Sequence, residues 1–95
     1  MRIRWYRQAI VDLTQLRRYI ADDNPEAAKR VAQRIQESVK QLADQPGIGR
    51  AGRIPGTRER VVSGTSYIVP YRVTGGAIEI LRVLHTARRW PEQGN

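Results

Sequence analysis

The side chains best suited to chemistry on a phosphate group lie mainly in the last third of the chain. Arg82, His85 and Arg88 occur within seven residues, and Arg58 lies on an earlier segment. Cleavage of a phosphodiester needs a base, an acid and cations that stabilise the transition state. The three arginines could supply positive charge, and His85 could move a proton because imidazole titrates near neutral pH. In a structural role, His85 would instead end a strand and bond to the following loop.

A second set of residues suits binding rather than proton transfer. Its members are Arg72, Arg82, Arg88, Arg89 and Trp90. Trp90 could stack on a base but cannot transfer a proton. In a structural role, Trp90 would instead form a hydrophobic plug that folds back over the sheet or the helices. We expect Arg82 and Arg88 at an exposed rim, where substitution should cost little stability.

The charge balance predicts an anionic partner. The formal net charge is +8, and fifteen of the seventeen basic residues are arginine. Arginine suits planar contacts with phosphate or carboxylate, although a high-GC genome would also favour arginine over lysine. Residues 1–46 carry +3 and residues 47–95 carry +5. Nucleic acid or an acidic protein is therefore the expected partner, with the C-terminal half as the more basic face.

Several classes of protein do not fit this composition. The sequence has no cysteine and one histidine, which argues against disulfides, a metal centre and a metal cofactor. The loop Pro46–Gly56 lacks the Gly-Lys-Ser/Thr ending of a nucleotide-binding P-loop. No apolar run is long enough to cross a membrane, and Met1–Trp5 does not lead into a signal-peptide core. We expect a cytoplasmic protein without a cofactor.

The N-terminal half predicts one strand and two helices. Residues 2–6 alternate in polarity, and apolar residues recur at helical spacing from Gln8 to Ala21 and again from Pro25 to Ala43. Asn24 can cap the second helix, and Pro25 suits its first position. The apolar positions expected to face the core are Ile10, Leu13, Leu16, Ile20, Ala28, Val31, Ile35, Val39 and Leu42.

The C-terminal half predicts three strands, Arg58–Val62, Tyr67–Val73 and Ala77–Leu84. Pro70 in the middle strand cannot donate to a ladder, which indicates a bulge or an N–H position that faces no neighbour. The order β-α-α-β-β-β predicts a single α+β domain, residues 1–95, with a helical hairpin packed on one face of a small, mostly antiparallel sheet. The other sheet face should be partly open.

The order and spacing of short motifs resemble the RelE/ParE superfamily of toxins over nearly the whole chain. The N-terminal motifs are a Trp near the start, Asp12-Leu13, Tyr19-Ile20, Asn24-Pro25, Ala27-Ala28 and Pro46-Gly47; the C-terminal ones are Gly56–Glu59, Tyr67–Val69, Tyr71–Val73, Ile78–His85 and Ala87-Arg88. The resemblance implies a growth-arresting toxin that forms a hetero-oligomer with an acidic antitoxin.

Two targets follow from this resemblance. RelE-type members cut mRNA on the ribosome, and in that case Arg58, Arg82, His85 and Arg88 are the candidate catalytic residues. ParE-type members inhibit DNA gyrase and are not known as nucleases. No Tyr or Lys follows Tyr71, unlike the RelE-type enzymes, so the ParE-like function is favoured. A basic nucleic-acid-binding module is the weakest alternative, because no helix-turn-helix, RNP-like strand or zinc motif is present.

Overall fold

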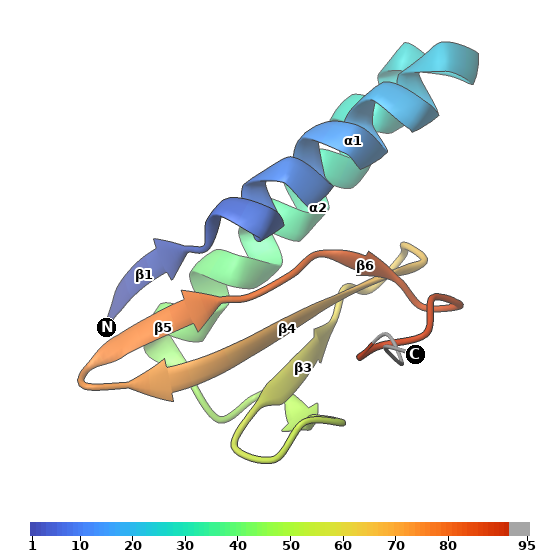
Figure 1. The fold of residues 1–95 in the computed structure, drawn as a ribbon. Coiled ribbons are helices and arrows are strands. Elements are labelled where there is room, and N and C mark those ends of the chain that lie inside the picture. Colours follow the sequence, from blue (N-terminus) through green and yellow to red (C-terminus); the bar gives the residue numbers. More distant parts are fainter. Residues whose placement is uncertain (92–95) are drawn as a thin grey trace.

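The computed structural model describes residues 1–91 and confirms the α+β class (Figure 1). Two helices form a hairpin on one side of a six-stranded sheet and extend beyond it. The last four residues of the expected 1–95 domain lie outside the described residues. The elements are β1 (Arg2–Trp5), α1 (Arg7–Asp23), α2 (Pro25–Asp44), β2 (Arg50–Ala51), β3 (Arg58–Val61), β4 (Tyr67–Thr74), β5 (Ala77–Ile80) and β6 (Leu84–His85).

The sheet is mixed, with strand order β1-β5-β4-β3-β2 and β6 beside β4. Strand β1 pairs in parallel with β5, and the other pairs are antiparallel. The two-residue turn between β4 and β5 is Gly75-Gly76, both with positive φ, as a type I′ hairpin requires. This tight turn fixes the register in which Tyr71 faces Ile80 and Arg72 faces Glu79.

The expected single strand Ala77–Leu84 is wrong, because the chain leaves β5 after Ile80 and rejoins β4 only at β6. The cause is Pro70 on the facing strand. Its carbonyl accepts hydrogen bonds from the N–H groups of both Leu81 and Arg82, at 2.9 and 3.5 Å. The N–H and C=O of one strand residue point to the same side, so the missing donor of Pro70 faces this break. The bulge that Pro70 predicted therefore lies at Leu81 and Arg82, which face Pro70, and not in β4 itself.

The helical hairpin forms as the sequence predicts. The side chain of Asn24 accepts from the N–H of Ala27 at 3.0 Å and caps α2, and Pro25 opens the helix. Ile10 is the exception among the expected core residues, because 51% of it is exposed. Position 12 is buried instead and carries an aspartate. Hydrogen bonds from Arg82 and from the N–H of Val83 compensate the buried charge of this aspartate.

The core lies between the hairpin and the sheet. Its fully buried members include Ile35 and Leu42 from α2 and Ile78 and Ile80 from β5. Ile3 and Trp5 of β1 pack against this cluster from one side. Tyr71 of β4 is also fully buried, and its hydroxyl donates to Pro46 O at 2.7 Å and accepts from Gly49 N at 2.9 Å. Tyr71 thereby joins the sheet to the loop after α2.

Candidate functional site

The polar interior is organised around three buried carboxylates, each of which is held by arginine. Asp12, Glu59 and Glu79 are at most 8% exposed. Their ion-pair partners are Arg82 for Asp12, Arg50 and Arg53 for Glu59, and Arg72 and Arg4 for Glu79. A buried charge is tolerated only when it is paired and hydrogen-bonded. Many of the C-terminal arginines therefore balance internal charge.

Asp12 ties helix α1 to the segment between β5 and β6. Its carboxylate accepts from Arg82 Nε at 2.8 Å, from Arg82 Nη2 at 3.1 Å and from the N–H of Val83 at 3.0 Å. Burial opposes ionisation, but the hydrogen bonds from Arg82 and Val83 outweigh it and hold the pKa of Asp12 below its ordinary value. This carboxylate is charged at neutral pH and neutralises Arg82 directly.

Arg82 is not the exposed rim residue that the sequence suggests. Only 15% of its side chain is exposed, and its guanidinium lies 5.4 Å from the ring centre of Trp90. The expected exposed position of Arg82 is therefore wrong, and its substitution should cost more stability than a surface change does. The strand break after Ile80 is the reason, since it turns position 82 toward α1. No strand alternation in the sequence could have placed it there.

Trp90 closes over Arg82 as part of the C-terminal segment. Its ring is half-buried, and its carbonyl accepts from Arg53 Nη1 at 3.5 Å. The Nε1 of Trp90 is buried and has no hydrogen-bond partner among the described residues. The half-buried position of Trp90 favours its structural role as a hydrophobic plug over a role in stacking on a base. Arg89, next to it, is exposed.

Arg72 lies in a second polar cluster on the sheet face opposite the helices. Its Nε donates to Glu79 at 2.6 Å and its Nη2 donates to the Tyr6 hydroxyl at 2.7 Å. The hydrogen bond from Arg72 lowers the pKa of Glu79, and the same bond raises the pKa of Arg72. Nearly half of the Arg72 side chain stays exposed. It remains available to a partner as part of a fixed, preorganised group.

Arg58 and His85 are not brought together. Arg58 pairs with Tyr71 and donates to Gly49 O at 2.8 Å, whereas His85 pairs with Tyr67 on the other edge of β4. These two tyrosines are four positions apart, which is about 13 Å along the strand. The four candidate catalytic residues therefore do not form one cluster, because Arg58 lies away from His85.

His85 lies instead in a shallow groove of about 220 Å³ between α1 and the end of the sheet. The Tyr67 ring meets the imidazole edge-on, at 5.5 Å between ring centres, and the exposed Tyr19 and Arg88 also line the groove. Burial raises the pKa of Tyr67, and the nearby Tyr19 adds to the effect. Neither tyrosine is among the candidate site residues predicted from the sequence. The spacing of Asp12, Leu16 and Tyr19 on one helical face was the available signal.

The His85 ring is held by its own loop. Its Nδ1 accepts from the N–H of Ala87 at 3.0 Å, and its carbonyl accepts from Arg88 N at 2.9 Å. Since Nδ1 is the acceptor, the neutral imidazole carries its proton on Nε2. This is the structural hydrogen bond expected as the alternative to catalysis.

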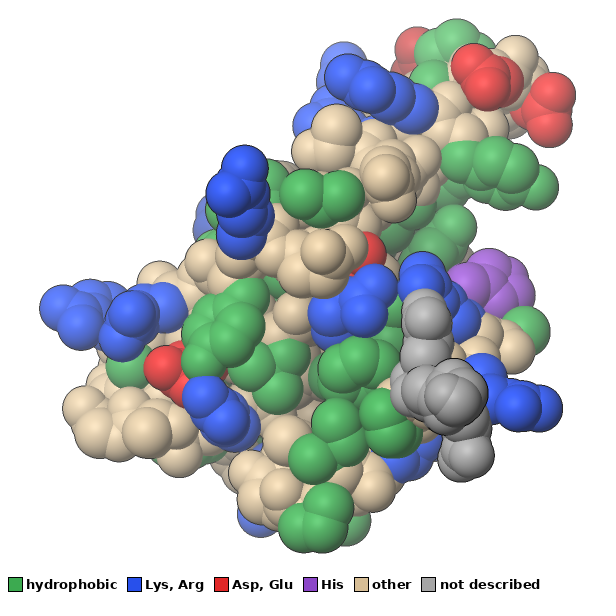
Figure 2. All heavy atoms as spheres, viewed as in Figure 1, with side chains coloured by type: hydrophobic (Ala, Val, Ile, Leu, Met, Phe, Trp, Pro, Cys, Tyr) green, Lys and Arg blue, Asp and Glu red, His purple; other side chains and the backbone are tan. Residues whose placement is uncertain are grey.

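Basic side chains are spread over the face shown in Figure 2, whereas acidic ones stand out at the far end of the hairpin. Within residues 1–91, no group of three or more His, Asp or Glu side chains is placed to hold a metal ion. Neither helix in the same stretch is long and apolar enough to cross a membrane.

The fold and this arginine-rich surface define a small α+β protein of the RelE/ParE toxin class. Residues 3–90 match the family described as the ParE toxin of the type II toxin-antitoxin system, parDE. The chain belongs to this family of toxins. The resemblance inferred from its short motifs is thereby confirmed.

Relatives and a solved structure agree with this assignment. The chain is 45% identical over 91 residues to a Sinorhizobium fredii protein named "Putative toxin Y4kP", covering 96% of this chain and 94% of that protein. It is 36% identical to Toxin RelE2 of Caulobacter vibrioides, covering 88% and 93%. A solved structure described as "Chromosomal ParDE TA system from P. aeruginosa" superposes with a TM-score of 0.79 at 34% identity, covering 90% of this chain and 95% of that chain.

Proposed function

We propose that this toxin arrests growth in the cytoplasm by binding DNA gyrase without catalysing a reaction, and that an acidic antitoxin neutralises it. The observation that carries the proposal is the dispersal of the groups that RNA cleavage would need. Arg82 is held by Asp12, Arg58 is held by the loop carbonyls, and His85 lies away from Arg58 and forms no ion pair within residues 1–91. A binding protein does not require these groups to converge.

The protonation pattern of His85 supports the same conclusion. A general base must offer an unprotonated nitrogen within hydrogen-bond reach of the hydroxyl it activates. In the neutral ring Nδ1 already accepts from Ala87, and Nε2 carries the proton. His85 can donate a hydrogen bond to a partner in this state, which suits recognition better than proton abstraction.

Ribosome-dependent mRNA cleavage is the second candidate, and one specific observation favours it. Tyr67, His85 and Arg88 line one groove, and together they offer a phenol, an imidazole and a cation. Relatives named as RelE toxins also match most of this chain. In that case the groove beside α1, rather than Arg58, would receive the substrate.

The antitoxin partner is supported by charge and by the solved neighbour. That neighbour is named as part of a ParDE toxin–antitoxin system. The net charge of this chain is +8, and its internal carboxylates neutralise only part of the arginine set. An acidic segment that folds on binding would satisfy the remaining cations, and toxin and antitoxin would form a hetero-oligomer.

Replacing His85 with glutamine separates the two candidate mechanisms. Glutamine keeps some hydrogen bonding but cannot act as an acid or base near neutral pH. An enzyme should lose about 10²–10⁴-fold in activity, whereas a gyrase-binding toxin loses at most one contact. We therefore expect His85→Gln to remain toxic in a colony-formation assay under induction without antitoxin, with protein amounts checked by immunoblot.

The matched control is Thr86→Ala, an exposed neighbour of His85. Wild-type protein and both variants are also tested for mRNA cleavage in a purified translation system. Non-toxic but folded His85→Gln protein, combined with ribosome-dependent cleavage by the wild type, would replace gyrase binding with the nuclease mechanism.

A further inference from the structure

A small polar hollow lies between α2 and the end of β3, and it shares no residue with the groove beside His85. Its volume is about 180 Å³, and it is lined by Arg34, Glu37, Ser38, Gln41, Arg60 and Ser63. The first four occupy positions i, i+3, i+4 and i+7 of α2, so they lie on one face of the helix. Arg60 belongs to β3, and Ser63 begins the turn that follows this strand. The hollow therefore joins a helix and a strand that are distant in the sequence.

Arg60 connects the sheet to α2 at this hollow. Its Nη2 donates to the side-chain oxygen of Gln41 at 2.6 Å, which fixes the position of the guanidinium. Its Nε is buried and has no hydrogen-bond partner among residues 1–91. Burying the N–H of a charged group without an acceptor costs free energy, and such groups in folded proteins are nearly always hydrogen-bonded. The Nε of Arg60 is therefore a donor that suits an acceptor from another molecule.

Arg34 is held at the hollow by the turn after β3. Its Nη1 donates to the carbonyl oxygen of Ser63 at 3.3 Å. The guanidinium lies directly against Gly64, since a Cβ added at this glycine would be 2.8 Å from Arg34 Nη1. Gly64 also has a φ of +75°, a conformation that disfavours a side chain. Glycine at position 64 therefore leaves room for the guanidinium, and Arg34 keeps further N–H donors beyond the one it uses.

The lining of the hollow offers more hydrogen-bond donors than acceptors. Among the described residues, each of the two guanidiniums makes one hydrogen bond, and neither forms an ion pair. The hydroxyls of Ser38 and Ser63 make no side-chain hydrogen bond in the same stretch. Glu37 is the one acidic residue of the lining, and it is exposed. The charge of this lining is therefore positive, which suits an anion.

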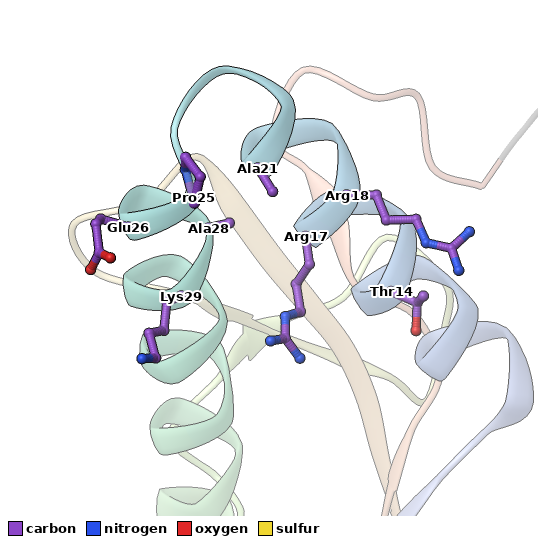
Figure 3. A pocket seen from close by; sticks show the side chains of 8 residues that line it. All are labelled: Thr14, Arg17, Arg18, Ala21, Pro25, Glu26, Ala28 and Lys29. Atoms are coloured by element: carbon purple, nitrogen blue, oxygen red, sulfur yellow. The ribbon is translucent and has the colours of Figure 1, made fainter.

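The cations at the tip of the helical hairpin provide a contrast. Arg17, Arg18 and Lys29 line a hollow of about 530 Å³, but in Figure 3 the two arginine side chains extend in different directions from α1. Among residues 1–91, no hydrogen bond or ion pair holds any of these three side chains. A hollow of about 590 Å³ at the base of the hairpin is lined mainly by apolar side chains such as Ile10 and Leu13. Of these three hollows, the one between α2 and β3 has cations that are already anchored, so binding there costs less side-chain entropy.

We propose that Arg34 and Arg60 form a binding site for a single phosphate group, either free inorganic phosphate or the terminal phosphate of a small monoester. The two guanidiniums come from a helix and from a strand, and the hydroxyls of Ser38 and Ser63 add donors. Such a three-dimensional set of donors suits a tetrahedral oxyanion better than a flat carboxylate. The hollow of about 180 Å³ is smaller than the roughly 300–1,000 Å³ of sites that enclose a whole small molecule. The site therefore takes the phosphate group and leaves the rest of an ester in solvent.

A bound phosphate would join α2 to the sheet. Its oxygens would accept from the buried Nε of Arg60 and from the guanidinium of Arg34, so one ligand would connect the strand to the helix. A ligand that binds only the folded state stabilises that state. A phosphodiester in a nucleic acid carries less charge and fewer free oxygens than a phosphate monoester, so it would use fewer of these donors. Neither the gyrase target nor the antitoxin enters this inference.

The test is a titration of isotope-labelled protein with sodium phosphate at constant ionic strength, followed by NMR. The Arg60 Nε–H resonance should shift until it saturates, with a Kd of about 1 mM or below. Arg34→Gln and Arg60→Gln should each weaken the Kd by at least about 10-fold. Glu37→Gln should tighten it by about threefold, because this variant removes a negative charge beside the anion. Arg30→Gln is the charge control, one turn earlier on α2 and outside the hollow, and its Kd should stay within about twofold.

Thermal unfolding provides an independent measurement, after circular dichroism has established that each variant is folded. Phosphate at about ten times the Kd should raise the Tm of the wild type by about 5 °C, and it should not raise the Tm of the Arg34→Gln/Arg60→Gln double variant. Shifts that never saturate, or that persist unchanged in the double variant, would overturn the site.

Adenosine monophosphate and a short DNA duplex distinguish the sources of the phosphate group. Displacement of phosphate by adenosine monophosphate would assign the site to monoesters, and binding of inorganic phosphate alone would assign it to the free ion. A duplex that displaces phosphate and requires the same two arginines, while adenosine monophosphate does not compete, would overturn the proposal in favour of a nucleic-acid contact.

Discussion

Replacing Asp12 with alanine is expected to lower the free energy of unfolding by about 3–5 kcal/mol, because it leaves a mostly buried arginine without its counter-charge. The Arg82 side chain is only 15% exposed, and Val83 N–H also loses its acceptor. The segment between β5 and β6 would then be detached from α1. Urea denaturation followed by circular dichroism at pH 7 measures the loss.

Two controls define the origin of this loss. Asp22→Ala removes an exposed carboxylate on the same helix and should change stability by less than about 0.5 kcal/mol. The pKa of Asp12 is lowered from its ordinary 3.8. Its contribution is therefore present above about pH 4 and disappears as the pH falls through the folded-state value. A loss under about 1 kcal/mol at pH 7, unchanged at pH 2, would contradict the assigned role.

Replacing Tyr71 with alanine is expected to cost about 3–5 kcal/mol, the range for removing a large buried ring. The side chain is fully buried between β4 and the helices, and its hydroxyl joins Pro46 and Gly49. Tyr71→Phe keeps the ring and removes only the tether, so it should cost about 1–3 kcal/mol. Thermal and urea unfolding of the two variants separate packing from hydrogen bonding.

A third variant examines the same tether from the loop side. A Cβ added at Gly49 would lie 2.6 Å from Tyr71 Cε1 and 3.0 Å from Glu59 O. Gly49→Ala should therefore destabilise the protein as well, whereas Gly47→Ala, with no atom within 4 Å, should not. Equal stability of Tyr71→Phe and wild type would show that the tether contributes nothing.

The fold was predictable where one local rule decided the outcome. Asn24-Pro25 marked the start of α2, and helical spacing located most of the core. The third strand was mispredicted because its end depends on Pro70 in a different strand. Ile10 was mispredicted because an apolar side chain at a helical position can equally face an open groove.

The candidate site was less predictable than the fold, since it depends on contacts between distant residues. Arg82 was singled out from the sequence, but its partner Asp12 lies seventy positions earlier. His85 could be placed at a strand end, but its neighbours Tyr19 and Tyr67 follow from the packing of α1 and the register of β6. Charge counting placed the basic face in the C-terminal half, but buried carboxylates pair with four arginines of that half, Arg50, Arg53, Arg72 and Arg82.

The central claim is that this toxin acts by binding gyrase, and the most direct measurement is ATP-dependent supercoiling of relaxed plasmid by purified gyrase with the purified toxin. We predict that wild-type protein and His85→Gln both inhibit supercoiling, that added antitoxin restores it, and that neither protein cleaves mRNA on translating ribosomes. Undiminished supercoiling at a large molar excess of toxin, together with mRNA cleavage that His85→Gln abolishes, would contradict the account.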